Sequence, residues 1–260
     1  MLRNATTRTV AVINSLLRAG PGGVGVRELA GQLLLSRSAT HRVLATLAEL
    51  GAARSLDGGR YEATATIRAW GTFMATRHPA LSAGREVMDA LAQASGENIH
   101  MLLATPDPAV GIFVATAPGP NPIQHTVTLG KPSPTTEGAA GKALLSSMPD
   151  DAIARVLQAL AERDPERAAT LERELPEVRR EGFATSRHEL LADIAGVAAP
   201  FSRNGEPYGA LTVSMPEYRR TEETDERHIP LLREATARLS SLLDERPSAG
   251  PQEKTAGRPA

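Results

Sequence analysis

The sequence predicts an α+β protein of two domains, in which a small helical domain with a β-hairpin precedes a larger domain built around an antiparallel sheet. Three observations predict this fold. Helical patterns followed by a hairpin pattern fill residues 7–64, β-rich runs begin near residue 98 and return near residue 196, and helical patterns fill the interval between those runs. Strands at both ends of a segment with helices between them are typical of an α+β domain.

Composition is consistent with ordinary globular domains. The chain has 260 residues, of which 41% are hydrophobic, so it is long enough for two packed cores. Its lack of cysteine excludes disulfides, thiol catalysis and thiolate metal sites. No run resembles a signal peptide and no apolar stretch approaches the roughly 20 residues that cross a bilayer. We therefore expect a cytoplasmic protein with no membrane partner, which ends in a disordered polar tail over residues 246–260.

Charge is distributed unevenly along the chain. Residues 1–65 hold eight arginines against four acidic residues, whereas the rest of the chain holds 21 basic against 26 acidic residues. A basic first domain on an acidic body indicates contact with nucleic acid through the first domain, because neutralised phosphates carry non-specific binding.

Three helices are expected in the first domain. The first runs from about Thr7 to Arg18 and is stopped by the GPGG sequence at 20–23, the second lies in residues 26–35, and the third begins at Ser36, a good N-cap. At 100° per residue the third helix has two faces. The packing face is predicted to hold Thr40, Val43, Leu44, Leu47 and Leu50. The opposite face holds Arg37, Ser38, His41 and Arg42.

A hairpin follows the third helix, with Asp57-Gly58-Gly59 at its tip and Arg54 and Arg60 on its arms. Glycines supply the positive φ angles that a tight turn needs. Helices in this order with a terminal hairpin predict a winged helix-turn-helix, whose last helix enters the major groove of DNA while the two wing arginines lie along phosphates. The alternative for the polar residues of the third helix is a solvated face that contacts no DNA.

We divide the chain into a winged domain over 1–66, linker helices over 67–96 and a second domain over 97–245. Trp70 and Phe73, at helical spacing in the linker, suit either core packing or a dimer contact. A small winged domain usually reads half a site, so a homodimer on a pseudo-palindrome is expected.

In the second domain the pattern alternates between strands and helices. Strands are expected over 98–105, 109–117, 126–130, 196–201 and 208–215, the last two around the Asn204-Gly205 turn. Helices are expected from near Thr136, over 150–163, over 166–182 and from about Glu222 to Leu243. Pro176 should kink or interrupt the third of these.

Several blocks of the chain resemble the IclR family of bacterial transcription regulators. They are LSRSATHRVLATLAELGAARSLDGGRYEAT, TTEGAAGKALLSSM, LPEVRREGFATSRHELLADIAGVAAPFSRNGEPYGALTVSMP and the closing helix, and they occur in the family's order from about residue 8 to 244. The resemblance implies a winged helix joined to a GAF-like effector domain. It also implies dimers or dimers of dimers that respond to small metabolites, often carboxylates.

The resemblance further implies where the effector binds. The family's cavity is lined by the start of the GKALL helix, by the segment after EGFA and by the last two strands. In this sequence those positions are Thr136, Ala139, Ala140, Ser186, Gly196, Thr212 and Ser214. Hydroxyl groups and free amides at a helix start would suit a small anion. The alternative is that Thr212 and Ser214 merely face solvent.

The chain also departs from the family pattern. Ser186-Arg187-His188 stands where relatives commonly carry an acidic residue, and Gly196 where many carry cysteine. The pocket could therefore take a different or larger ligand. Arg187 and His188 would either supply positive charge to an acidic effector or be exposed loop residues, and we favour exposure. The segment after the hairpin lacks the family's usual leucine-glycine pair.

An enzyme with a small-molecule pocket and a nucleic-acid-binding head is the alternative class. The six histidines form no HExxH motif, and the sequence has no GxSxG. Around Gly141-Lys142 it is similar to a P-loop, but position 143 is Ala and the first glycine is misplaced, so close helix packing explains the small residues better. A purely architectural DNA-binding protein would not explain the large acidic domain.

These observations together predict a regulator with no catalytic, cofactor or metal site, whose operator binding is modulated by a small molecule, expected to be a carboxylate. Operator contacts are expected from Ser36, Arg37, Ser38, His41, Arg42, Arg54 and Arg60. Repressors and activators share this layout, so the sequence leaves the direction of the response open.

Overall fold

The computed structural model describes residues 4–20, 22–123, 125, 127–190 and 192–245, and the expected tail over 246–260 lies outside them. Two compact units make up the chain, Met1–His78 and Pro79–Ala260. The division falls inside the segment expected to form linker helices. Helix α4 (Ala65–Arg77) belongs to the first unit, and α5 (Pro79–Ser95) packs into the core of the second.

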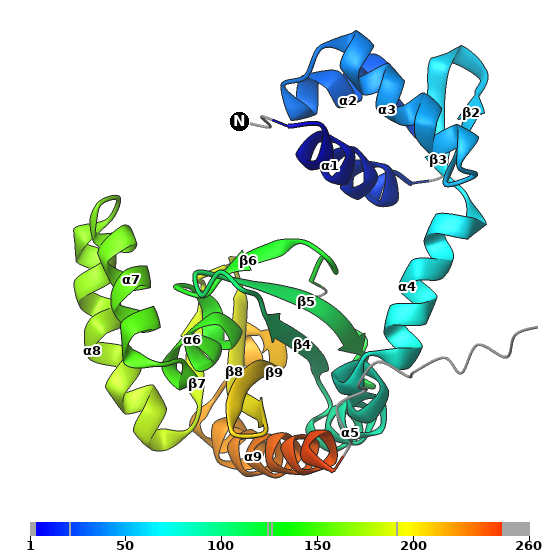
Figure 1. Cartoon of the computed structure of the whole chain (residues 1–260). Helices are drawn as coiled ribbons and strands as arrows, with labels where there is room; N and C mark the ends of the chain where they lie inside the picture. The colour runs from blue at the N-terminus through cyan, green and yellow to red at the C-terminus, as the bar shows by residue number, and fades with distance from the viewer. Residues whose placement is uncertain (1–3, 21, 124, 126, 191, 246–260) are drawn as a thin grey trace, which may run out of the picture. The chain divides into compact units, whose positions relative to one another are not determined.

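The first unit has the predicted order of helices and hairpin (Figure 1). Its elements before α4 are α1 (Ala5–Arg18), β1 (Val24–Gly25), α2 (Val26–Leu33), α3 (Arg37–Glu49), β2 (Ala53–Leu56) and β3 (Arg60–Ala63). Strand β3 pairs antiparallel with both β1 and β2. At the hairpin tip, Gly58 and Gly59 have φ angles of 74° and 69°, which confirms the predicted turn.

A single apolar core joins the helices of the first unit. Leu16 of α1, Leu29 of α2, Leu44 of α3 and Ile67 of α4 are fully buried. One predicted packing residue is wrong: Leu50 is 71% exposed, because α3 ends at Glu49 and Leu50 is its C-cap, beyond the last turn that the core covers.

The second unit is built on a six-stranded antiparallel sheet of order β6-β5-β4-β9-β8-β7. The strands are β4 (Asn98–Ala104), β5 (Val110–Ala117), β6 (Pro132–Pro134), β7 (Ala184–Arg187), β8 (Ile194–Arg203) and β9 (Glu206–Pro216). Asn204 and Gly205, with φ of 53° and 77°, form the predicted turn between β8 and β9.

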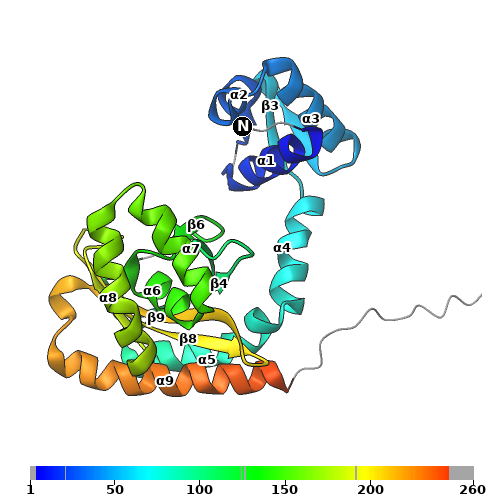
Figure 2. The same cartoon turned by 60° about the vertical axis from the view of Figure 1, so that its left-hand side comes forward.

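Helices cover both faces of this sheet (Figures 1 and 2). Helix α5 and helix α9 (Glu222–Asp244) pack on one face, around Met101, Leu211 and Val213. Helix α6 (Gly138–Ser147) packs directly on the other, and α7 (Asp150–Ala161) and α8 (Pro165–Glu181) form a pair beside it. Among the described residues, we find no helix with the length and apolar content needed to span a membrane.

Two expectations about the second unit are wrong. Residue 126 lies outside the described residues, but residues 127–130 form no strand, because the chain turns at Gly130 (φ 74°), whose amide donates to the Phe113 carbonyl at 2.8 Å. The edge strand follows this turn as β6 and pairs with β5. Helix α8 runs through Pro176 without interruption.

Candidate nucleic-acid interface and effector site

Helix α3 presents one polar face outside the core. Its N-cap is Ser36, whose Oγ accepts the Ala39 amide at 3.2 Å, as the sequence predicted. The predicted polar residues Arg37, Ser38, His41 and Arg42 are all exposed, whereas Thr40, Leu44 and Leu47 are buried. The amphipathic division expected from the sequence therefore holds along most of the helix.

A groove of about 910 Å³ lies between α3, the start of α2 and the wing tip. Four arginines line it, and among the described residues no acidic side chain does. The lining consists of Gly25, Val26, Arg27, Arg37, Ser38, His41, Arg42, Gly58, Gly59 and Arg60. This groove has the charge that a nucleic-acid backbone requires.

Three of the four arginines that line the groove are unpaired. Within the described part of the chain, Arg27, Arg37 and Arg42 make no ion pair or side-chain hydrogen bond. Arg27 was not among the DNA-contact residues predicted from the sequence, because α2 was expected only to pack in the core. Its position at the start of α2, directly after β1, is the signal that could have identified it.

The wing arginines, by contrast, have partners in the protein. Arg54 forms an ion pair with Glu62, its cross-strand neighbour, while its own side chain stays 68% exposed. Arg60 donates through Nε to the Gly22 carbonyl at 2.8 Å and through a terminal nitrogen to the Gly23 carbonyl at 2.5 Å. Arg60 therefore fastens the wing to the segment before β1, a role that the sequence did not suggest.

His41 connects the recognition helix to the wing. Its Nε2 lies 3.5 Å from the hydroxyl of Tyr61, which is buried in β3, and the two rings meet edge to face. This contact joins α3 to the hairpin without burying the histidine.

On the α6-covered face of the second unit's sheet, polar side chains replace the apolar ones near one end. Ser214 of β9 pairs in register with Asn98 of β4 and Gly196 of β8, and Thr212 pairs with His100. Thr212 and Ser214 are 7% and 5% exposed. The alternative in which these two hydroxyls face solvent is therefore wrong.

Helix α6 closes over these residues. A Cβ added at Gly196 would lie 3.6 Å from the Cβ of Ala139 and 3.3 Å from Cγ2 of Thr212. Ala139 and Ala140 are buried, and so is Thr136, just before the helix. The structure thus brings Ala139, Gly196, Thr212 and Ser214 together, and both Ala139 and Ala140 pack in the core on this face of the sheet.

Three buried polar atoms at this place find no hydrogen-bond partner among the described residues. They are Oγ1 of Thr212 and Nε2 of His100 and His125. His100 Nδ1 lies 3.0 Å from the Thr116 hydroxyl, and His125 Nδ1 lies 3.3 Å from the Ser214 hydroxyl. Unpaired buried polar atoms are costly, so their gathering at one place marks a candidate ligand site.

The pKa values of both histidines are lowered. Burial, and to a lesser extent the nearby His125, lower the pKa of His100 to about 4. The backbone carbonyl of His125 acts in the opposite direction and raises this pKa, although Nε2 of His100 has no hydrogen-bond partner among the described residues. Burial also lowers the pKa of His125. Both imidazoles are therefore neutral near pH 7.

Sequence analysis missed Asn98, His100 and His125 as site residues. A signal was present in β4, where Asn98 and His100 alternate with apolar residues. Alternate residues of a strand share a face, so the two side chains lie beside Thr212 and Ser214. His125 lies outside regular structure, and no period could have placed it.

The first amide of α6 is not free for an anion, contrary to expectation. The Gly138 amide donates to the Glu189 carboxylate at 2.9 Å. The same carboxylate accepts from Lys142 at 2.7 Å and from Arg167 at 3.2 Å, and Glu174 completes the cluster. Lys142, whose side chain is 6% exposed, is thus a structural cation and not a phosphate ligand.

Close packing explains the glycine before this lysine, as the sequence analysis favoured. A Cβ at Gly141 would lie 2.6 Å from the Pro134 carbonyl oxygen. In the described part of the chain, no three His, Cys, Asp or Glu side chains gather to hold a metal ion.

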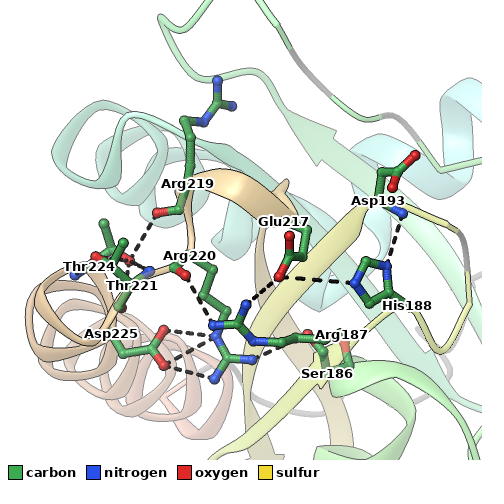
Figure 3. A network of polar contacts seen from close by, with 10 residues as sticks. All are labelled: Ser186, Arg187, His188, Asp193, Glu217, Arg219, Arg220, Thr221, Thr224 and Asp225. Carbon is green, nitrogen blue, oxygen red and sulfur yellow. Dashed lines mark hydrogen bonds and ion pairs between the residues drawn. The ribbon is translucent and has the colours of Figure 1, made fainter.

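Figure 3 shows the polar network around Ser186. Arg187 donates to Glu217 at 2.5 Å and to the Arg220 carbonyl at 3.0 Å, and both Arg187 and His188 are exposed, as favoured. Arg220 pairs with Asp225 at 2.7 Å and reaches the Ser186 carbonyl at 3.4 Å. These contacts fix β7 to the start of α9 and engage both arginines outside the ligand face.

Fold and site together define a winged-helix DNA-binding protein with a separate α+β domain. Comparison with known families makes the class specific. The model described as "Bacterial transcriptional regulator IclR C-terminal" matches residues 72–241, and the "IclR helix-turn-helix domain" matches residues 5–57. The chain belongs to the IclR family of transcriptional regulators, as its sequence blocks indicated.

Individual relatives agree with this membership. The chain is 24% identical over 227 residues to the HTH-type transcriptional regulator KdgR of Escherichia coli (strain K12), which covers 85% of this chain and 86% of that protein. Among solved structures, it is similar to an IclR transcriptional regulator from Alicyclobacillus acidocaldarius, with a TM-score of 0.81 and 22% identity over 92% of this chain and 98% of that one.

A second similar structure contains a ligand. It is an IclR homolog from Microbacterium hydrocarbonoxydans complexed with 4-hydroxybenzoate, with a TM-score of 0.73 and 18% identity, covering 92% of this chain and 99% of that one. At this identity the likeness shows the shared fold.

Proposed function

We propose that this regulator binds a specific operator through the groove between α3 and the wing, and that a small molecule in the second unit modulates the binding. The observation that carries the DNA proposal is the groove itself, which four arginines line, whereas no acidic side chain among the described residues lines it. Arg60 lies 3.8 Å from Glu28, and Arg27, Arg37 and Arg42 have no such partner in the described part of the chain. Family membership supplies the context of transcriptional regulation.

The polar residues that line the groove, together with Ser36 and Arg54, have proposed roles. Arg37, Ser38 and Arg42 read base edges or clamp phosphates in the major groove, because Arg reaches guanine O6 and N7 and a hydroxyl serves either target. Ser36 positions the first turn of α3, and His41 holds it against the wing. Arg27, Arg54 and Arg60 contact flanking phosphates, although Arg60 also holds the wing together.

We infer that the effector is a small carboxylate bound beneath α6. The unpaired atoms of Thr212, His100 and His125 support this position, and Ser214 and Gly196 complete its floor. Thr136, Ala139, Ala140 and Ser186 surround that floor in the proposal inferred from the family. A carboxylate ligand, 4-hydroxybenzoate, in a protein of the same fold supports the chemical class.

A homodimer is proposed, with a dimer of dimers as the larger alternative. Trp70 and Phe73 on α4 are 53% and 59% exposed, so the core role weighed from the sequence is wrong for them. Val10 and Leu17 on α1 are also exposed, at 52% and 39%. Exposed large apolar side chains of this kind suit a subunit interface.

Coupling is proposed to pass through α4 and α5. A ligand alters DNA binding only if both sites bias a shared element, and these helices join the two units in the chain. Effector binding would change the angle between the two winged domains of the dimer.

The test is a fluorescence-anisotropy titration of the full chain against its own upstream intergenic DNA, with non-specific competitor and two salt concentrations. Saturable binding that survives competitor is expected, with affinity that falls as salt rises. Binding that competitor abolishes would refute a sequence-specific regulator and return attention to an enzyme with a nucleic-acid-binding head.

A further inference from the structure

The family pattern does not explain His100 and His125. Both lie on the sheet face beneath α6 that holds Thr212 and Ser214, which we call the ligand face. We propose that the two histidines together recognise the carboxylate group of the effector and take up one proton as it binds. This inference rests on the proposed function and adds its recognition residues and its dependence on pH.

The geometry leaves the same atom free on each ring. Thr116 occupies Nδ1 of His100 at 3.0 Å, and Ser214 occupies Nδ1 of His125 at 3.3 Å. The ring centroids are 6.0 Å apart and the rings meet edge to face. Because a hydroxyl can donate or accept, each Nδ1 is satisfied whether or not it carries a proton, and each Nε2 is available to donate to a ligand.

A third donor belongs to the same group. Thr212 faces His100 directly in the β4–β9 ladder, and its hydroxyl is buried without a partner in the part of the chain that is described. Two imidazole nitrogens and a hydroxyl provide three donors, and the two oxygens of a carboxylate can accept all of them. An apolar effector would leave all three unsatisfied.

His125 is held in place by the sheet although it lies outside a strand. Asn98 donates to the His125 carbonyl at 2.7 Å and accepts the Gly119 amide at 3.0 Å. The same strand therefore positions both histidines, one by its own backbone and one through Asn98.

The site lacks a free cation to neutralise a carboxylate. Over this face α6 contributes Lys142, which pairs with Glu174 and with Glu189 of the β7–β8 connection. The cross-strand partners of His100 on β5 and β9 are Thr116 and Thr212, and the Phe113 ring of β5 also lies beside it. Among the described residues, the titratable group that acts on His100 is His125. An imidazolium formed on binding supplies the missing positive charge.

Affinity for the carboxylate depends on pH because its binding is linked to the uptake of a proton. Burial holds the pKa of free His100 at about 4, and a carboxylate beside the pair raises the pKa of the histidine that contacts it. Affinity for the carboxylate then falls as pH rises between these two pKa values, by up to about tenfold per pH unit for one proton. An uncharged ligand gives no such slope.

The experiment uses the full-length chain labelled with ¹⁵N-histidine. Imidazole NMR signals are followed from about pH 5.5 to 8, across the range in which histidine normally titrates. The probes are acetate, benzoate and 4-hydroxybenzoate, each paired with its amide. His100→Gln and His125→Gln assign the signals, and His188→Gln, at an exposed histidine, is the matched control. Anisotropy of operator DNA is recorded on the same samples.

The expected result is that at least one carboxylate, and not its amide, shifts the His100 and His125 signals toward the protonated form, with affinity that weakens as pH rises. His100→Gln and His125→Gln should each weaken that carboxylate at least tenfold and retain operator binding, while His188→Gln changes neither. Because His125 is the less buried of the two, His125→Gln keeps the test valid if His100→Gln fails to fold.

Two outcomes overturn the inference. The first is that no carboxylate of the series shifts either histidine signal. The second is a carboxylate that releases the operator equally well from the variants, or with a flat pH profile, which leaves the proposed function standing. If the unmodified protein does not bind operator DNA, that separate result contradicts the proposed function and not the histidine chemistry.

Discussion

Arginines of the first unit divide into two groups according to what they already contact. Arg37 and Arg42 are exposed on α3 and have no partner in the described structure, whereas Arg60 donates to two backbone carbonyls. A free guanidinium can contact DNA without breaking an existing bond. An arginine that already has protein partners would both bind phosphate and stabilise the fold. Substitutions in the two groups should therefore differ in their effect on the free energy of unfolding.

Arg37→Ala and Arg42→Ala should weaken operator binding without changing stability. A base contact is worth about 1–3 kcal/mol, and its loss relaxes preference at one base position. Anisotropy against the operator and its single-base variants measures both effects. Arg155→Ala is the control, because Arg155 is an exposed arginine of α7 paired with Asp151. Affinity unchanged in both groove variants would refute the proposed recognition face.

Arg60→Ala should lower the free energy of unfolding of the first unit by about 1 kcal/mol, because the bonds to Gly22 and Gly23 are lost from a half-exposed side chain. Arg54→Ala should weaken DNA binding with little effect on stability, since its ion pair is exposed. Chemical denaturation measures the difference. Equal stabilities for the two variants would show that Arg60 does not fasten the wing.

At the scale of elements, helix α6 is held in place at its start by several polar and packing contacts. Its first amide, its lysine and the neighbouring α8 meet in one charge cluster around Glu189, and Gly141 permits its close approach to β6. The helix is therefore fixed at its start, next to the proposed ligand floor. A rigid helix beside a ligand face can transmit occupancy to its neighbours.

Lys142→Met should destabilise the protein by about 3 kcal/mol, because it removes a buried cation and leaves the Glu174 and Glu189 carboxylates with Arg167 as their cationic partner. The Gly138 amide would remain as a donor to Glu189. Thermal unfolding is the measurement, with Arg163→Met on the exposed end of the α7–α8 connection as a control. A stability equal to that of the parent would mean that the cluster contributes little.

The elements could be predicted largely because their signals are local. The Ser36 cap, the Gly58-Gly59 turn and the Asn204-Gly205 turn are each encoded in a few neighbouring residues, and the structure has all three. The edge strand was misplaced for the opposite reason. Its position depends on the bond from Gly130 to Phe113, which joins residues far apart in sequence.

The ligand face shows the same limit more clearly. Thr212 and Ser214 were proposed from the family pattern, but His125 comes to Ser214 from 89 positions earlier in the chain and has no periodic signal. Glu189 at the start of α6 was likewise unforeseen, because a contact across 51 positions leaves no local trace. Long-range tertiary contacts, and not helix or strand preference, decide which groups face a ligand.

For the whole molecule, the central feature is the separation of charge and task between two units. The basic first unit has the arginine-lined groove, and the larger second unit has the unpaired polar atoms beneath α6. In the proposed function a second copy of the chain is needed to read a complete operator with useful affinity. The exposed aromatic residues of α4 are where we expect that copy to bind.

Trp70→Glu combined with Phe73→Glu should convert the dimer to a monomer and weaken operator binding at least tenfold, because the charges would be buried unpaired in the interface. Sedimentation analysis gives the oligomeric state. Tyr218→Glu, at an exposed aromatic residue of the second unit, is the control. A double variant that remains dimeric would place the interface elsewhere, and a parent protein that is itself monomeric would contradict the proposed homodimer.

The most direct test of a regulator that reads DNA with paired winged domains is a DNase I and hydroxyl-radical footprint of the full chain on its upstream region. We expect two protected half-sites related by a pseudo-twofold axis and separated by about one helical turn, 10 base pairs, or a multiple of it. Protection should be lost from both in Arg37→Ala/Arg42→Ala. Uniform protection without discrete half-sites, or the same footprint from the double variant, would contradict the account.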